Sequence, residues 1–319
     1  MINVFRPFSE KITDILTIES LTRDVHLKPI HSHNDYWRKR PFFDALLYGC
    51  TSIEGDVWKF HKDYTVTDTV TESTSRFIRD QVYVGHNQVH LKSENTLEAL
   101  YLRPLYRMLE SANKVFSEPI MSMPSKKFGV FFDSPELTLN LWLDLKTEGV
   151  ETYLALKQQL KMFMDKGYLA YYNVSEASFV DGPVAITLTG DVPWTFLEEE
   201  EKSVDSRQVF LDCPLEQFFE ADEKTRQKYR KFCLFASASL EHLLGKEDFK
   251  SSLSRDFSEA QKSRLKQSFD AAHALGIKTR VWGGVDWPIH VRDMHWKSLW
   301  RLGCDLINAD DLEAAANMF

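Results

Sequence analysis

Three short segments of this chain carry pairs of reactive side chains two positions apart. Each pair ends or interrupts an apolar run. The pairs are His31 and His33, Glu54 and Asp56, and Asp144 and Lys146. On a β-strand, residues i and i+2 point to the same face of the sheet. The spacing therefore predicts three strands that each present both members of a pair on one face.

The pair Glu54 and Asp56 points to a bound cation. Two carboxylates about 4 Å apart repel by about 4 kcal/mol at an effective dielectric constant of about 20. Buried acids therefore need a shared proton, a basic partner or a cation. Asp144 adds a third carboxylate, and oxygen ligands suit Mg²⁺ or Ca²⁺ better than zinc. For Glu54 and Asp56 taken alone, two salt-bridged acids at a solvated strand end remain the alternative.

The other side chains fit phosphate chemistry. His31 or His33, together with His86 from a short β segment at 81–86, could supply a nucleophile or base and a general acid. Lys146 could neutralise a phosphate oxygen, and Trp282 could line a substrate pocket. The alternatives are hydrogen-bonded structural histidines, a lysine that reaches solvent and a tryptophan of the core or rim.

Eight strand-like segments alternate, mostly, with helical ones. Strands are expected at 27–33, 50–57, 139–145, 183–189, 208–211, 234–238, 278–282 and 306–308. Helices are expected at 41–49, 96–112, 150–166 and 258–275. This alternation predicts a parallel sheet of the α/β class. Eight such units in 319 residues predict a (β/α)₈ TIM-type barrel, with its site at the carboxyl ends of the strands.

The domain organisation expected from this pattern is simple. Residues 1–26 form an N-terminal arm and residues 27–319 form one barrel. The segment 64–79 lacks a helical stripe and is expected to be an inserted loop or hairpin. It leads to the β segment at 81–86, which is an excursion outside the eight strands.

Composition limits the partners and the location. The net charge of −8 argues against a nucleic-acid partner. No run approaches the eighteen or so apolar residues of a membrane span, and the chain does not start with a secretory signal. Four cysteines lie far apart without metal-ligand spacing, so reduced thiols and no disulfide framework are expected; they are Cys50, Cys213, Cys233 and Cys304. An intracellular protein is expected, with peripheral membrane contact as a further hypothesis.

Several strings together resemble a known family. They include Lys28-Pro-Ile-His-Ser-His-Asn-Asp-Tyr-Trp-Arg-Lys, Ser52-Ile-Glu-Gly-Asp-Val-Trp, Val84-Gly-His-Asn and Leu143-Asp-Leu-Lys. The chain resembles the fungal "altered inheritance of mitochondria protein 6" family. That family belongs to the phospholipase-C-like phosphodiesterases, with glycerophosphodiester phosphodiesterases and spider-venom phospholipase D. The resemblance covers residues 28–319 and implies a TIM-type barrel.

The resemblance also implies roles for single residues. It implies a Mg²⁺ or Ca²⁺ ion held by the residues that match its acidic ligands, which are Glu54, Asp56 and Asp144. It implies two catalytic histidines, for which His33 and His86 match best. His33 is preferred to His31 because it precedes Glu54 by 21 positions, closer to the usual spacing. Lys146 matches a lysine near the substrate phosphate, and His31 and Trp282 are further candidates for substrate binding.

The favoured function is a metal-dependent phosphodiesterase acting on a glycerophosphodiester or a phospholipid headgroup. Attack by water or by an internal hydroxyl, which would give a cyclic phosphate, stays open. The alternative is a non-catalytic barrel that binds a phospholipid or a phosphorylated metabolite; a zinc hydrolase would need Cys or His clusters that the sequence lacks. The stretch between Asp56 and His86 is longer than is usual in the superfamily. Mitochondrial association is an expectation from the family name only.

Overall fold

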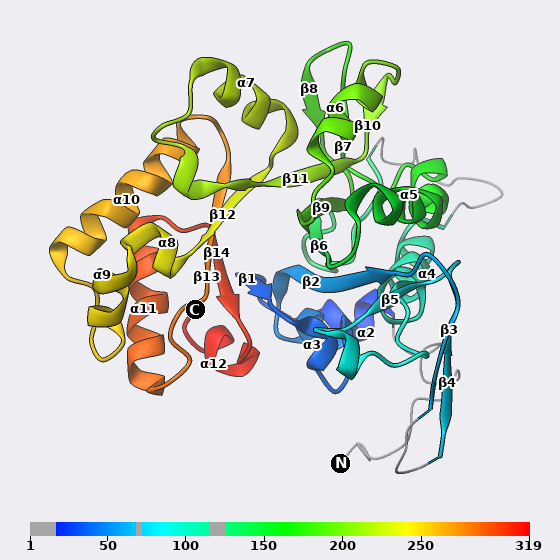
Figure 1. Ribbon diagram of the computed structural model, residues 1–319, viewed down its shortest axis with the longest axis horizontal. Coiled ribbons are helices and arrows are strands. Elements are labelled where there is room, and N and C mark those ends of the chain that lie inside the picture. The colour runs from blue at the N-terminus through cyan, green and yellow to red at the C-terminus, as the bar shows by residue number, and fades with distance from the viewer. Residues whose placement is uncertain (1–16, 68–71, 115–125) are drawn as a thin grey trace.

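The computed structural model describes residues 17–67, 72–114 and 126–319, and its centre is a ring of eight parallel strands (Figure 1). Their order round the ring is β1 (Lys28–Ser32), β14 (Leu306–Ala309), β13 (Lys278–Trp282), β12 (Phe235–Ser239), β11 (Val209–Pro214), β9 (Val184–Gly190), β6 (Leu139–Leu145) and β2 (Cys50–Lys59). Pairing of β1 with β2 closes the ring. The predicted (β/α)₈ barrel is confirmed, and each of the eight expected strands is a barrel strand.

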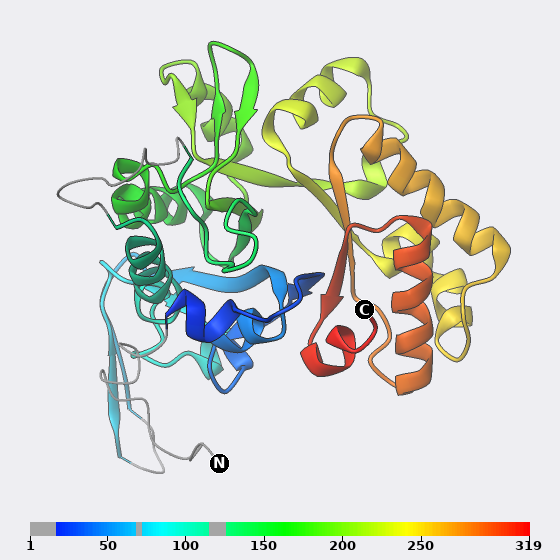
Figure 2. The same cartoon turned by 180° about the vertical axis from the view of Figure 1, so that it is seen from behind.

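Helices between the strands cover the outside of the ring (Figure 2). They include α3 (Phe43–Leu47), α4 (Arg103–Ala112), α5 (Gly149–Asp165), α6 (Trp194–Glu201), α7 (Glu223–Phe232), α8 (Leu240–Leu244), α9 (Lys246–Ser252), α10 (Glu259–His273), α11 (Ile289–Leu302) and α12 (Leu312–Ala316). Sequence signals set their ends: α10 starts at a capping box between Ser258 and Gln261. The helix expected at 96–112 begins as a π-helical turn, Glu98–Leu102, which ends just before Pro104, a residue with no N–H to donate.

The interior of the barrel is apolar at one end and polar at the other. Trp142 is fully buried and packs with Phe235 and Leu306 near the amino ends of the strands. Two positions beyond Trp142 on β6 lies Asp144, which the register places beside Asp56 of β2. Polar side chains therefore collect at the carboxyl ends of the strands, above a packed apolar layer.

An excursion after β2 approaches the barrel from outside the ring. The predicted insertion at 64–79 contains the antiparallel strands β3 (Tyr64–Thr67) and β4 (Thr74–Phe77). Strand β5 (Val82–Val84) then pairs antiparallel to the end of β2. The amide of Gly85 donates to the carbonyl of Asp56 at 3.1 Å, and this bond brings His86 to the end of the barrel where Asp56 lies.

One expectation about the cysteines is wrong. Cys213 and Cys233 form a disulfide with their Cα atoms 6.0 Å apart, whereas Cys50 and Cys304 are buried free thiols as expected. Cys213 lies on β11, and Cys233 follows α7, which packs on that strand. The two are 20 positions apart in the sequence, and only the β11–α7–β12 unit brings them together.

The first described residues belong to the packed body of the protein. Helix α2 (Ile18–Thr22) buries Ile18 and Leu21 in the main core. Residues 1–16 of the expected arm lie outside the described residues. Within the described ranges, no helix is long and apolar enough to cross a bilayer.

Candidate metal and phosphate site

Three carboxylates meet at the carboxyl ends of β2 and β6. Ligand oxygens of Glu54, Asp56 and Asp144 all lie within 4.8 Å of one another. Glu54 and Asp56 are buried, and Asp144 is partly exposed. The sequence predicted this set, and the pleat and register of two neighbouring strands account for it. Such a cluster is stable only with compensating positive charge.

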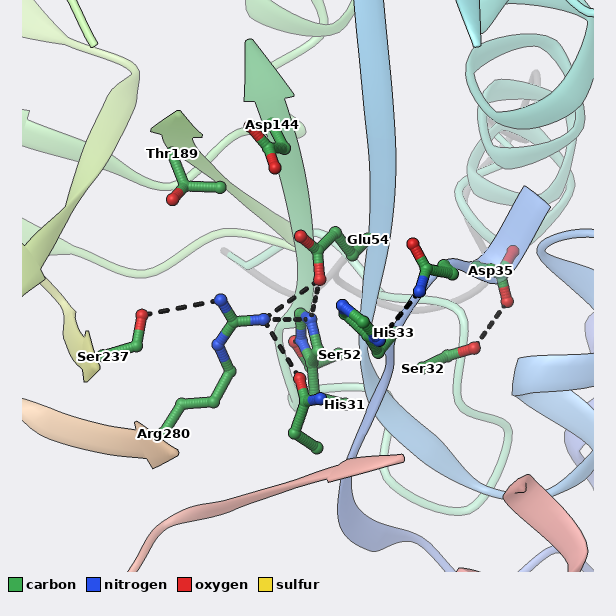
Figure 3. A network of polar contacts seen from close by, with 12 residues as sticks. His31, Ser32, His33, Asp35, Ser52, Glu54, Asp144, Thr189, Ser237 and Arg280 are labelled. Atoms are coloured by element: carbon green, nitrogen blue, oxygen red, sulfur yellow. Dashed lines mark hydrogen bonds and ion pairs between the residues drawn. The ribbon is translucent and has the colours of Figure 1, made fainter. Parts of the chain in front are cut away.

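Glu54 is compensated from inside the barrel. Its Oε2 lies 2.7 Å from His31 Nε2 and 3.0 Å from a guanidinium nitrogen of Arg280 (Figure 3). Burial alone would raise the pKa of Glu54, but the charge of Arg280 and the hydrogen bond from His31 hold that pKa below its ordinary value. Glu54 is therefore a carboxylate at neutral pH.

Asp56 and Asp144 share a lysine. Lys146 Nζ lies 2.6 Å from Asp144 Oδ2 and 3.2 Å from Asp56 Oδ2, and the Tyr36 hydroxyl donates to the same Asp56 oxygen at 2.8 Å. Burial and the neighbouring charge of Asp144 raise the pKa of Asp56 to about 7, although Lys146 lowers it. The acids therefore carry more negative charge than one lysine offsets.

The three acids each keep one oxygen available. All the hydrogen bonds and ion pairs that they make within the described chain go to Glu54 Oε2, Asp56 Oδ2 and Asp144 Oδ2. The second oxygens are left for another ligand, and a set of three carboxylates suits Mg²⁺ or Ca²⁺. The donor set thus fits the predicted cation.

Gly190 leaves room for Asp144. A Cβ atom on Gly190, at the end of β9, would lie 2.1 Å from Asp144 Oδ1, and the residue has φ +78°. Both the close approach and the left-handed backbone favour glycine here. The free oxygen of Asp144 therefore occupies space that any other residue at 190 would fill.

His31 contacts Glu54 in the interior of the barrel. It has no exposed surface, and Ser52 Oγ lies 2.7 Å from its Nδ1 while Glu54 lies at its Nε2. Burial and the charge of Arg280 lower its pKa to about 4, so the ring is neutral. Nε2 lies 2.7 Å both from Glu54 Oε2 and from Nη1 of Arg280, which can only donate, so the tautomer of the neutral ring decides which of these two bonds Nε2 makes. This position suits a side chain that orients Glu54 better than one that touches substrate.

His33 lies at the mouth of the barrel and is oriented by Asp310. Its Nδ1 is 3.2 Å from either carboxylate oxygen of Asp310. Burial opposes protonation of His33, but the hydrogen bond to Asp310 and the charges of Glu54 and Asp310 raise its pKa. A carboxylate at Nδ1 directs Nε2 as the atom that exchanges protons.

His86 lies next to Asp56 of the acid cluster. Its Nδ1 lies 3.6 Å from Asp56 Oδ2 and 3.3 Å from the Tyr36 hydroxyl. Its ring packs against Trp37 with centroids 4.9 Å apart, and about half of the side chain is exposed. The structure thus brings His86 to Asp56, and it brings His33 near Glu54.

A cavity of about 270 Å³ opens beside His33. Asn308 and Asp310 line it near the barrel, and apolar side chains including Val285 and Trp296 line it further out. Trp282, the predicted substrate contact, ends β13 and is 41% exposed. Its role in binding stays a prediction.

Sequence reasoning missed three side chains of this site. They are Tyr36, Ser52 and Arg280, each of which contacts a predicted residue. Two of them could have been found, because Ser52 precedes Glu54 by two positions and Arg280 precedes Trp282 by two. The two members of each predicted pair are separated by the same two positions.

The fold and the site together define a class: a (β/α)₈ barrel with a cluster of three acids that could hold a cation, and with two histidines near them at the carboxyl ends of the strands. A family profile described as an AIM6-like phosphodiesterase domain matches residues 19–212. The chain belongs to this family.

Named relatives match over most of the chain. "Altered inheritance of mitochondria protein 6" of Lachancea thermotolerans is 35% identical over 94% of this chain and 68% of its own length. The protein of that name from Saccharomyces cerevisiae (strain YJM789) is also 35% identical, over 94% of this chain and 73% of its own. A homolog from Arthroderma benhamiae is 33% identical, over 94% and 86% respectively. The resemblance drawn from the sequence is confirmed.

Proposed function

We propose that this protein is a metal-dependent phosphodiesterase that cleaves a glycerophosphodiester or a phospholipid headgroup. The observation that carries this proposal is that one ligand oxygen from each of Glu54, Asp56 and Asp144 lies within 4.8 Å of the others. The family's description as a phosphodiesterase domain supports the same reaction class. Mg²⁺ or Ca²⁺ bound there would polarise a phosphate oxygen and offset its charge.

The histidines have separate roles in this proposal. His33, oriented through Nδ1 by Asp310, attacks phosphorus or removes a proton from the attacking hydroxyl. His86, on the side of Asp56 and Tyr36, protonates the leaving alcohol. Lys146 lies between two of the acids and holds a phosphate oxygen by charge. The cavity beside His33 receives the alcohol or acyl part of the substrate.

Turnover of defined diesters tests the proposal. Purified protein is assayed with bis(p-nitrophenyl) phosphate, glycerophosphodiesters and lysophospholipids in Mg²⁺, Ca²⁺ or EDTA, with ³¹P NMR to separate a phosphomonoester from a cyclic phosphate. We expect metal-dependent turnover that is lost in Glu54→Gln and Asp144→Asn. The exposed acid Asp165 serves as control, and Asp165→Asn should keep full turnover.

The outcome also separates an enzyme from a binding barrel. Turnover that persists in EDTA or in Glu54→Gln would contradict the proposed site. Tight binding of a phosphodiester without any turnover would instead indicate the non-catalytic barrel, because a sensor needs no leaving-group acid such as His86.

A further inference from the structure

The disulfide changes the cellular location that we infer from the cysteines. An intracellular location rests partly on reduced thiols, and that premise is wrong for Cys213 and Cys233. Their Cα separation of 6.0 Å is typical of a bridge. Stable disulfides form in oxidising compartments and are rare in the cytosol. Cys50 and Cys304 are buried, which protects these free thiols in either environment.

A second feature points to the same compartments. Asn173-Val174-Ser175 is the one Asn-x-Ser/Thr motif in the sequence. This motif is the acceptor for N-linked glycans in proteins that pass through the secretory pathway. No part of the candidate catalytic site uses it.

The structure presents Asn173 as an accessible acceptor. It ends β7 (Tyr171–Asn173), and a tight turn with exposed residues 175–177 leads to β8 (Ser178–Val180). Its Oδ1 accepts from the backbone amides of Ser175 and Glu176, each at 3.1 Å. Because backbone amides only donate, these bonds identify the side-chain oxygen. The amide nitrogen Nδ2 then makes no hydrogen bond within the described chain and is available for modification.

The β7–β8 hairpin lies far from the candidate site. Leu169, just before β7, bridges to Val184, the first residue of β9. Phe179 of β8 shares a cavity with Lys28 and Lys278, the first residues of β1 and β13. The hairpin therefore stands at the amino ends of the strands and projects from the body of the barrel (Figure 2). A glycan there would leave the mouth of the barrel open.

We propose that Asn173 is an N-glycan acceptor and that this protein matures in an oxidising secretory compartment. The donor is an oligosaccharide linked to a polyprenyl pyrophosphate. Nδ2 attacks the anomeric carbon of the first sugar, so a C–N bond forms and the C–O bond to pyrophosphate breaks. Nδ2 loses one proton, and the pyrophosphate leaves with the bonding electrons.

Peptide mapping of the full-length product from fungal cells tests the proposal. The protein is denatured without reductant, its free thiols are alkylated, and its mass is compared before and after treatment with peptide N-glycosidase. We expect one enzyme-sensitive glycan at Asn173, a linked pair of peptides at Cys213 and Cys233, and alkylated Cys50 and Cys304. An unmodified Asn173, or alkylated Cys213 and Cys233, would overturn the proposal.

Matched variants make the site assignment specific. Asn173→Gln and Ser175→Ala should abolish the glycan, and Ser175→Ala keeps both backbone hydrogen bonds to Asn173. Ser175→Thr should keep the glycan. Asn95→Gln lies outside any acceptor motif and should leave the glycan in place. A glycan that survives in Ser175→Ala would show that Asn173 is not the acceptor.

Discussion

The guanidinium of Arg280 forms a buried ion pair with Glu54, at 3.0 Å and with both side chains about 95% buried. Removing one partner of a buried pair typically costs about 3–5 kcal/mol, because the other charge stays unpaired. We expect Arg280→Met to lower the free energy of unfolding, measured by urea titration, by about this amount. It should also abolish the rise in melting temperature that we expect from Mg²⁺ binding, because Glu54 loses a group that orients it.

The control for this prediction is Arg301, an exposed arginine on α11. Arg301→Met should change neither stability nor the Mg²⁺ effect. Arg280→Lys should have an intermediate stability and an intermediate Mg²⁺ effect, since one ammonium group cannot reach both Glu54 and Ser237, which contact different nitrogens of the guanidinium. If Arg280→Met is as stable as the parent and responds fully to Mg²⁺, Arg280 does not position Glu54.

His31, on β1, and His33, which follows that strand, should respond differently to substitution. His33→Ala is expected to lower kcat by about 10²–10⁴-fold while the melting temperature and Mg²⁺ binding stay near those of the parent. His31→Ala should destabilise the protein, because it removes a buried hydrogen-bond partner from both Glu54 and Ser52. Thermal unfolding and steady-state kinetics on both variants check this. Loss of turnover in a stable His31→Ala, with His33→Ala active, would reverse the assignment.

Gly190 provides a steric test of the metal site. Gly190→Ala places a methyl group 2.1 Å from Asp144 Oδ1 at a backbone conformation that favours glycine, so Asp144 must move. We expect weaker Mg²⁺ binding in calorimetry, by tenfold or more, and a loss of stability of about 1–3 kcal/mol. Gly276, with φ +75° and open space around it, is the matched control. Gly276→Ala should show the backbone cost without the change in Mg²⁺ affinity.

His295 predicts a pH dependence of stability. Its ring is buried against Phe257, with centroids 4.0 Å apart, and its Nε2 lies 2.9 Å from the carbonyl oxygen of Arg255. Burial lowers its pKa, although that hydrogen bond and Asp256 oppose the change. The unfolded chain therefore takes up a proton near pH 6.5 that the folded protein binds only at lower pH. Above about pH 6.5, the neutral ring makes its full contribution to the free energy of unfolding. That contribution decreases as the pH falls below this value.

A comparison with His295→Gln isolates this contribution. Glutamine keeps a donor for the Arg255 carbonyl but does not titrate. Between about pH 7.5 and about pH 5.5, the free energy of unfolding should fall more for the parent than for the variant. The extra fall is at most about 1.4 kcal/mol for each tenfold difference in proton affinity between the unfolded and the folded ring. If the free energy of unfolding changes equally with pH in the parent and in the variant, His295 has the same pKa in the folded and the unfolded protein.

The parts of the fold that follow from local patterns were predictable. All eight barrel strands lie where apolar runs alternate with helical stripes, and the acid cluster follows from two strands that are neighbours in the ring. Its residues needed only the two-residue period of a strand and the knowledge that parallel strands end together.

The remaining contacts depend on closure of the ring. Arg280 and Glu54 are 226 positions apart, and no local signal pairs them. Likewise, Asp310 reaches His33 because β14 lies beside β1. The bridge between Cys213 and Cys233 depends on how α7 returns to β11, which spacing alone does not specify.

Strand β5 delivers His86 from outside the closed ring, and this has an evolutionary consequence. The described residues of 60–81 connect β2 to β5 without contributing a strand to the barrel. Changing the length of such a surface connection costs little free energy. The length of this connection can therefore change in evolution and reposition His86, while Glu54, Asp56 and Asp144 keep their places on the barrel strands.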